Sequence, residues 1–191
     1  MAALVPNLAT RTAGERTGWL VLLGLAVAGS LLLAVSAKLS VQIGPVPFSF
    51  QTLMLLLIAA TYGRDLAVGT VLLYLAEGLV GLPVFTPTTA LGLAAFVGPT
   101  AGFLAGFVLC AAIVGEAADR GLDRSPLTLA PAMLLGIAAL FLLGWAWLAF
   151  GFGIGAQRAF AGGVAPFVVG DLVKIAIAAL AVPAGRALLK R

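Results

Sequence analysis

Long runs of apolar residues, separated by short stretches rich in Gly, Pro and charged residues, dominate this chain. Six runs approach the length of about 20 mostly apolar residues that a helix needs to cross a bilayer. They are Trp19–Ala37, Val46–Tyr62, Leu66–Leu82, Pro99–Ala118, Leu127–Phe150 and Pro166–Leu189, of which the second is short and interrupted at its start by Pro45 and Pro47. Within them the apolar residues do not alternate with polar ones, which favours helices over barrel strands. The pattern predicts an all-α integral membrane protein with six transmembrane helices, formed by one membrane domain over residues 19–191 after a cytoplasmic tail at residues 1–18.

The first run has a second interpretation as a secretory signal peptide, because Val35-Ser36-Ala37 resembles a small-residue cleavage site. The run Trp19–Ala37 is longer than the apolar region of about 7–15 residues that is typical of signal peptides. We therefore expect it to be retained as a helix.

Composition removes several classes of function. Of the 191 residues, 62% are hydrophobic and 9% are charged, which is more apolar surface than a soluble domain of this size can bury. Intrinsic disorder is excluded because disordered chains have low hydrophobicity. The chain has no His and a single Cys, Cys110, so it lacks the residues for a disulfide framework, a zinc site or a His-based triad. We expect neither an enzyme nor a bound metal or cofactor.

The basic residues are distributed unequally between the two predicted sides of the membrane. With the N-terminus inside, one side carries Arg11, Arg16, Arg64, Arg120, Arg124, Arg186, Lys190 and Arg191, and the other carries Lys38 and Arg158. The positive-inside rule then places both termini in the cytoplasm of a multi-pass protein of the cell membrane. The formal net charge of +4 reflects this bias rather than nucleic-acid binding.

The three predicted outer connections share a Gly/Pro element that ends in Phe. These elements are Gly44–Phe48, Gly81–Phe85 and Gly163–Phe167. Gly permits unusual backbone angles and Pro restricts them. One interpretation is that each element only ends a helix. The alternative is that apolar, Pro-ordered loops fold back over the bundle, where non-helical backbone can line a cavity. Three such loops on one side favour a covered ligand pocket near the outer face.

Asp171 and Lys174 are the clearest candidates for chemistry, because ionisable groups inside a span cost about 2.5–3.5 kcal/mol each. Their spacing of i, i+3 places them on one helix face, in the outer half of the membrane. They either form a self-satisfied ion pair or present an acceptor and a donor to a polar ligand. Gln51 offers a ligand both a donor and an acceptor, or caps a helix end. Three aromatic residues are candidates for apolar walls: Tyr74, Phe85 and Phe167.

Small residues recur every four positions in the first run, at Ala26, Ser30 and Ala34. Such a stripe allows another helix to approach closely. The approaching helix belongs either to this chain or to a separate membrane subunit.

Four segments together resemble the BioY family, the biotin-binding S subunits of energy-coupling-factor (ECF) vitamin transporters. They are Pro45–Thr52, Tyr74–Phe85, Gly98–Phe103 and Pro166–Lys174. The resemblance extends from about Ala26 to the C-terminus. Two departures stand out: Thr86-Pro87-Thr88-Thr89 replaces a more glycine-rich stretch, and Ser30 stands where the family's small-residue motif often has Ala.

The resemblance implies six helices, cytoplasmic termini and a loop-covered biotin pocket near the outer surface. It implies a transmembrane coupling subunit and two cytoplasmic ATPases as partners, with Ala26, Ser30 and Ala34 as the docking face. The alternative within the family is a solitary biotin transporter. An intramembrane enzyme suits the residues less well, because the chain has one Cys, no His and no clustered carboxylates within its spans. An ion-coupled permease with inverted repeats suits them less well, because the repeated loops all lie on one side.

For biotin, we expect Asp171 to accept from a ureido N–H, and Lys174 to donate to the ureido oxygen or to complete the local network. Gln51 is a further polar contact, and Tyr74, Phe85 and Phe167 pack against the ring system. For the carboxylate, Lys38 and Arg158 are candidates on charge alone.

Overall fold

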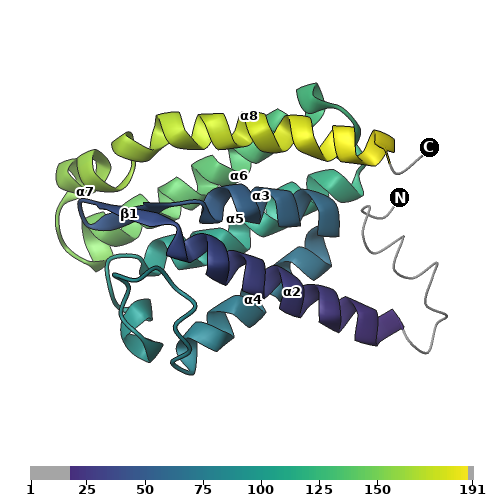
Figure 1. Ribbon diagram of the computed structural model, residues 1–191. Helices are drawn as coiled ribbons and strands as arrows, with labels where there is room; N and C mark the ends of the chain where they lie inside the picture. Colours follow the sequence, from purple (N-terminus) through teal and green to yellow (C-terminus); the bar gives the residue numbers. More distant parts are fainter. Residues whose placement is uncertain (1–17, 189–191) are drawn as a thin grey trace.

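A helix lies on each of the six apolar runs in the computed structural model, which describes residues 18–188 (Figure 1). Within this range the helices are α2 (Gly18–Lys38), α3 (Gln51–Tyr62), α4 (Arg64–Leu79), α5 (Ala101–Asp119), α6 (Pro126–Ala146) and α8 (Ala165–Leu188). Four segments are long and apolar enough to cross a membrane: α2, α5, α6 with its continuation to Gly151, and α8. A membrane protein built mostly of helices is therefore confirmed. Six crossings, their orientation and the division into tail and domain stay predictions, and Arg11, Arg16, Lys190 and Arg191 lie outside the described residues.

The connections contain more regular structure than the hydrophobic pattern predicts. Strands β1 (Ser40–Ile43) and β2 (Val46–Ser49) form an antiparallel hairpin in which Val41 pairs with Phe48. Gly44 has φ of +66° at its turn, a conformation that disfavours other residues. The remaining short elements are η1 (Gly92–Phe96), η2 (Leu122–Arg124), a π-helical turn η3 (Trp147–Gly151) and α7 (Ala156–Gly163).

Two predicted boundaries are wrong, and the fifth run keeps its predicted extent but changes its type of helix. The run Val46–Tyr62 begins as strand β2, and its helix starts only at Gln51, because Pro47 lies in extended backbone paired with Gln42. The fifth run, predicted to be helical to Phe150, changes to the π-helical turn after Ala146. The third Gly/Pro element is mostly helical rather than a loop: α7 ends at Gly163 and α8 begins at Ala165.

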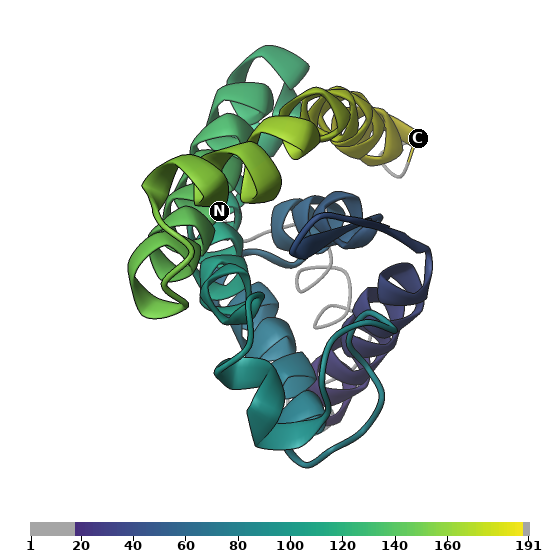
Figure 2. The same cartoon turned by 90° about the vertical axis from the view of Figure 1, so that its left-hand side faces the viewer.

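Helix α5 lies at the centre of the bundle and packs against α3, α4 and α6 (Figures 1 and 2). The buried share of its most apolar window is 67%, compared with 28% for α2. Glycine makes two of these contacts possible. A Cβ on Gly106 would lie 2.9 Å from Cα of Leu140 on α6, and one on Gly115 would lie 2.6 Å from Cα of Arg64 at the start of α4. Small residues thus allow the backbones to approach closely, as in other membrane bundles.

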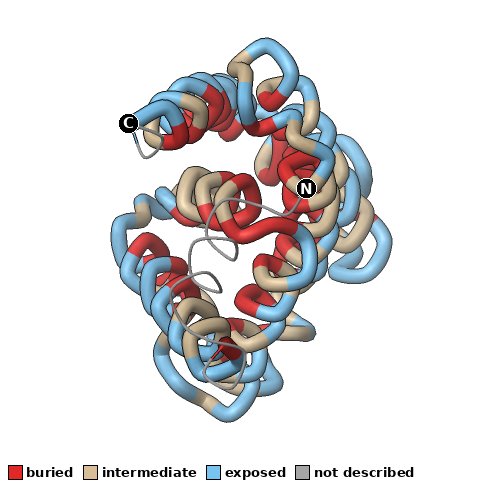
Figure 3. The backbone as a smooth tube through the Cα atoms, turned by 90° about the vertical axis from the view of Figure 1, so that its right-hand side faces the viewer, coloured by how far each residue is buried: buried red, intermediate tan, exposed pale blue. Residues whose placement is uncertain are grey.

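The outward faces of the helices remain apolar. Buried segments face the interior of the bundle, and exposed ones form its outside (Figure 3). Large exposed hydrophobic residues include Val35 on α2, Leu135 and Leu142 on α6, and Val169 and Leu180 on α8. A soluble protein rarely exposes so much contiguous apolar surface, whereas a bilayer solvates it.

The two ends of the bundle differ in character. The hairpin and α7 lie at one end, and α2 begins and α8 ends at the other (Figure 1). At the second end, Asp119 Oδ2 accepts a hydrogen bond from the backbone N–H of Arg64 (2.8 Å), and Arg186 pairs with Asp123 (2.9 Å). Burial raises the pKa of Asp123, and the Arg186 guanidinium opposes that shift. Charged residues from four segments thus gather at the end opposite the hairpin.

Candidate functional site

A cavity of about 70 Å³ lies near the hairpin end, with walls from α3, α4, α5, α6 and α8. Its lining includes all six residues that the sequence singles out as ligand contacts: Gln51, Tyr74, Phe85, Phe167, Asp171 and Lys174. The hairpin contributes Val46 and Pro47, and the segment after α4 contributes Thr86 and Thr89. Residues 120 positions apart in the sequence, such as Gln51 and Asp171, therefore face one space.

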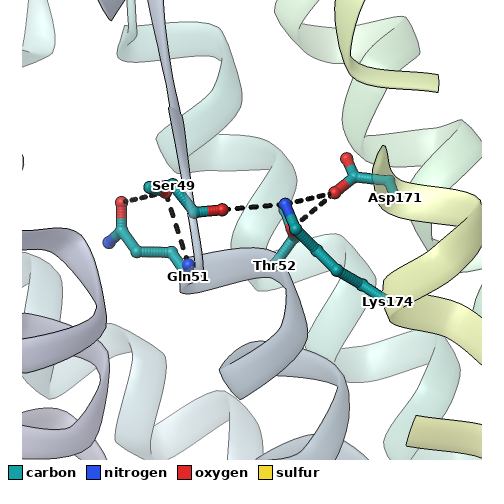
Figure 4. A network of polar contacts seen from close by, with 5 residues as sticks. All are labelled: Ser49, Gln51, Thr52, Asp171 and Lys174. Atoms are coloured by element: carbon teal, nitrogen blue, oxygen red, sulfur yellow. Dashed lines mark hydrogen bonds and ion pairs between the residues drawn. The ribbon is translucent and has the colours of Figure 1, made fainter. Parts of the chain in front are cut away.

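Lys174 forms three hydrogen bonds in this cavity. Its Nζ donates to Oδ1 of Asp171 (2.7 Å), to Oγ1 of Thr52 (2.9 Å) and to the backbone carbonyl of Ser49 (2.8 Å) (Figure 4). It also lies 4.1 Å from the centre of the Phe48 ring, a favourable cation–π position. An ammonium group has three N–H donors, so each donor of Lys174 has a protein acceptor.

Asp171 has acceptor capacity left. Oγ1 of Thr52 donates to its Oδ1 (2.7 Å), the same oxygen that receives the Lys174 bond. Among residues 18–188, none donates to Oδ2, which points away from Lys174 (Figure 4). Asp171 is 3% exposed, so its charge is held in a dry environment where hydrogen bonds to it are strong. The pair therefore presents an anionic acceptor to the cavity rather than a cationic donor.

A second polar chain connects α3 and α4 with the segment after α4. Nε2 of Gln51 donates to the hydroxyl of Tyr74 (2.7 Å), which donates to the carbonyl of Val84 (3.2 Å). The amide oxygen of Gln51 accepts from the Ser49 hydroxyl (3.3 Å) (Figure 4). Gln51 thus keeps one amide hydrogen beyond the bond to Tyr74, and both residues line the cavity.

Aromatic rings form much of the remaining wall. Phe85 meets Tyr74 edge-on, with centroids 5.3 Å apart, and Phe167 stacks on Phe48 at 6.0 Å. Phe103 and Phe107 of α5 complete the lining on the far side. The site therefore combines one short polar edge with an apolar, aromatic interior, as small-molecule sites commonly do.

The segment Gly81–Phe85, which the sequence predicts to cover the pocket, supplies Phe85 to the cavity wall and is fastened from α2. Nζ of Lys38 donates to the carbonyls of Pro83 and Phe85, the latter at 2.7 Å. The sequence offers Lys38 and Arg158 as carboxylate partners, but neither lines this cavity. Lys38 binds the covering segment instead, and Arg158 is exposed on α7.

Thr52 and Ser49 are the site residues that sequence reasoning missed. Thr52 joins Asp171 to Lys174, and Ser49 supplies a carbonyl to Lys174. The available signal was the run of polar residues Ser49, Gln51 and Thr52 at the start of an otherwise apolar helix.

The small-residue stripe on α2 is partly internal. Ser30 is fully buried and its hydroxyl donates to the Glu77 carboxylate on α4. A Cβ on the adjacent Gly29 would lie 2.7 Å from the Thr70 methyl group, so α2 and α4 approach closely here. Ala26 and Ala34 are half-buried, and their role as a docking face stays a prediction.

Comparison with known proteins agrees with this architecture. The model of the BioY family matches residues 9–191. The probable biotin transporter BioY of Pyrococcus horikoshii is 36% identical over 149 residues, which cover 78% of this chain and 86% of that protein. The biotin transporter BioY of Rhizobium etli is 34% identical over 168 residues, covering 84% and 89%. This chain belongs to the BioY family.

The same fold occurs in a solved structure. The crystal structure of the S-component for biotin from an ECF-type ABC transporter superposes with a TM-score of 0.81, covering 92% of this chain and 95% of that chain. The two sequences are 22% identical, so this likeness concerns the arrangement of the helices.

Proposed function

We propose that this chain is the membrane-embedded substrate-binding (S) subunit of an ECF transporter. It captures biotin at the outer face of the cell membrane and delivers it across with a transmembrane coupling subunit and two cytoplasmic ATPases. Membership of the BioY family and relatives named as biotin transporters support this function. The chain itself carries out no reaction; it binds and transfers its ligand.

The observation that carries the proposal is the unpaired oxygen of Asp171 beside an aromatic cavity. Biotin has a planar ureido group with two N–H donors, fused to an apolar ring that contains sulfur. Oδ2 of Asp171 accepts one ureido N–H, and the free amide hydrogen of Gln51 is available to a ureido oxygen. Tyr74, Phe85 and Phe167 pack against the sulfur-containing ring, a favourable contact.

Lys174 has a positioning role in this scheme. All three of its N–H groups are engaged by Ser49, Thr52 and Asp171, which favours the second of the two roles considered for it, completion of the local network. It stabilises the buried Asp171 charge and fixes which oxygen faces the ligand.

Orientation in the membrane follows from the charges at the two ends. Arg64, Arg120, Arg124 and Arg186 belong to the connections and helix end opposite the hairpin, and the positive-inside rule assigns that end to the cytoplasm. The cavity then opens toward the outside.

Calorimetric titration of the purified protein with biotin tests the proposal. We expect wild-type protein to bind, and Asp171→Asn to bind at least about tenfold more weakly, a loss of about 1.4 kcal/mol. Asp65→Asn is the matched control, because Asp65 is exposed at the start of α4, far from the cavity lining. If a folded Asp171→Asn protein binds biotin with wild-type affinity, Asp171 does not contact the ligand and the proposed site is wrong.

Cellular uptake of labelled biotin separates the two versions of the function. We expect uptake to require the coupling subunit and the ATPases. Undiminished uptake in cells that lack every coupling subunit would instead identify a solitary transporter.

A further inference from the structure

A second cavity, of about 140 Å³, adjoins the first on the side of the hairpin. It is enclosed by the hairpin, by residues 88–90 and by the segment from η1 to Thr100. Pro47, Thr89 and Thr100 line both cavities, so the two spaces share a wall at these residues. Nothing in the function proposed above uses this second space.

The second cavity is polar but uncharged. Its polar lining consists of Gln42, Thr88, Thr89 and Thr100, and none of the described residues that line it is Asp, Glu, Lys or Arg. Oγ1 of Thr88 donates to the amide oxygen of Gln42 (2.7 Å), and Oγ1 of Thr89 is hydrogen-bonded to Thr86 (2.7 Å). Hydroxyl and amide groups donate to a carboxylate, an amide or an ester oxygen alike.

Among the described residues, the cations of this end are either bonded within the protein or line neither cavity. Lys174 lines the first cavity, and its three donors are used within the protein. Lys38 donates to the carbonyls of Pro83 and Phe85, and Arg158 is exposed on α7. Within the part of the chain that the structure describes, neither of these two lines either cavity. A ligand carboxylate therefore meets no available cation, and Oδ2 of Asp171 repels it from the first cavity.

We infer that the second cavity receives the tail of the ligand and recognises it without regard to charge. This inference rests on the proposed function, in which the ureido ring occupies the first cavity. The substrate class then includes biotin and its neutral tail derivatives, the amide and the esters. Selection is made at the ring, where the anionic acceptor and the aromatic walls lie.

Titration of the full chain in lipid nanodiscs with biotin, biotinamide and biotin methyl ester tests the inference. We expect the three dissociation constants to agree within about fivefold, because the stronger hydrogen bonds that a carboxylate accepts are offset by the larger cost of removing its charge from water where no cation faces it. If biotin binds and biotinamide binds 30-fold or more weakly, the inference fails while the proposed function stands. If none of the three binds, the proposed function fails and the inference with it.

A variant that adds a cation tests where the tail lies. Ala90 is exposed and lines the second cavity, so Ala90→Lys places an ammonium group beside the tail. We expect this variant to favour biotin over biotinamide by about tenfold, in a manner that weakens with added salt. Ala161→Lys, on the exposed face of α7, is the control and leaves the ratio unchanged. An unchanged ratio in Ala90→Lys would show that the tail lies elsewhere, and the wild-type ratios remain decisive if this variant fails to fold.

Discussion

At the scale of single residues, the site depends on which of its polar atoms are already bonded. Lys174 and Asp171 form a buried ion pair, and removing one partner of such a pair leaves an uncompensated charge. Both bonds that Asp171 accepts within the protein reach Oδ1, which leaves Oδ2 available to the cavity. The carboxylate is consequently oriented before any ligand arrives, which lowers the entropic cost of binding.

Thr52 is the residue that holds this orientation, since its hydroxyl donates to Asp171 and accepts from Lys174. We expect Thr52→Val to weaken biotin binding about tenfold, or about 1.4 kcal/mol, in a titration of purified protein. Thr52→Ser restores the hydroxyl and should recover most of the affinity. Thr61→Val is the control on the same helix, because the Thr61 hydroxyl bonds only to the backbone carbonyls of Leu57 and Ile58. Equal affinity in Thr52→Val and wild type would contradict this role.

The part of the candidate site that could be predicted consists of ionisable side chains, because burying them in a membrane costs free energy and makes them stand out. Asp171 and Lys174 stand out in an apolar helix, and both line the cavity. Thr52 does not stand out, because a threonine in a membrane helix commonly bonds to its own backbone, as Thr61 and Thr70 do here. Its partners on α8 lie 119 and 122 positions away in the sequence, and such distant contacts produce no local sequence pattern.

At the scale of elements, the predicted cover of the cavity is the short segment Gly81–Phe85, which is attached at two places. Gly81–Phe85 is fastened to α2 through Lys38 and to α4 through the Tyr74 hydroxyl. The same Tyr74 bonds to Gln51 inside the cavity. This segment is therefore connected to the polar groups of the site, and we expect its attachments to slow the release of the ligand.

Lys38 provides the test of this expectation. We expect Lys38→Met to increase the rate of biotin dissociation about fivefold to tenfold, because two hydrogen bonds from a charged group to the cover are lost. Surface plasmon resonance or filter-binding chase experiments measure that rate. Arg158→Met removes another cation of the same end that does not bind the cover, and should leave the rate unchanged. An equal effect of both variants would indicate long-range electrostatics instead.

The contact between α5 and α6 permits a matched comparison of two glycines. A Cβ on Gly106 meets the backbone of Leu140 at 2.9 Å, whereas one on Gly69 of α4 has no atom within 4 Å. We expect Gly106→Ala to lower the melting temperature in detergent, since overpacking costs about 1–3 kcal/mol. Gly69→Ala should leave it unchanged or raise it, because alanine favours the helix by up to about 1 kcal/mol. Equal melting temperatures for the two variants would mean that α5 and α6 do not approach this closely.

The helices were predictable because each requires only a continuous apolar run. The hairpin at Ser40–Ser49 and helix α7 were not, for different reasons. Pro45 and Pro47 correctly mark an interruption, but the pairing of β1 with β2 depends on partners across a turn. Helix α7 follows Gly153 and Gly155, both with positive φ, and its eight residues are too few for a reliable period.

At the scale of the whole molecule, the two ends differ in composition. The cavities, the hairpin and the cover lie at one end, and the clustered charges lie at the other. Arg64 and Arg120 both pair with Glu116, at 3.5 Å and 2.8 Å, and Arg186 pairs with Asp123. The pairs with Glu116 connect α4 with the end of α5, and the pair with Asp123 connects α8 with η2, whereas the cavity end is formed by the hairpin and short connecting segments. This asymmetry agrees with the proposed entry of the ligand at the cavity end.

The proposed orientation of these ends can be measured with single cysteines. Cys110 is buried, and Cys110→Ser provides a background without it. Arg158 at the cavity end and Arg120 at the charged end are both exposed. In intact cells, a membrane-impermeant maleimide should label Arg158→Cys and should not label Arg120→Cys, because only the cavity end is proposed to face the outside. Opened membranes should allow both to react, which controls for reactivity. The opposite labelling pattern would place the cavity on the cytoplasmic side, and the positive-inside assignment would then be wrong for this chain.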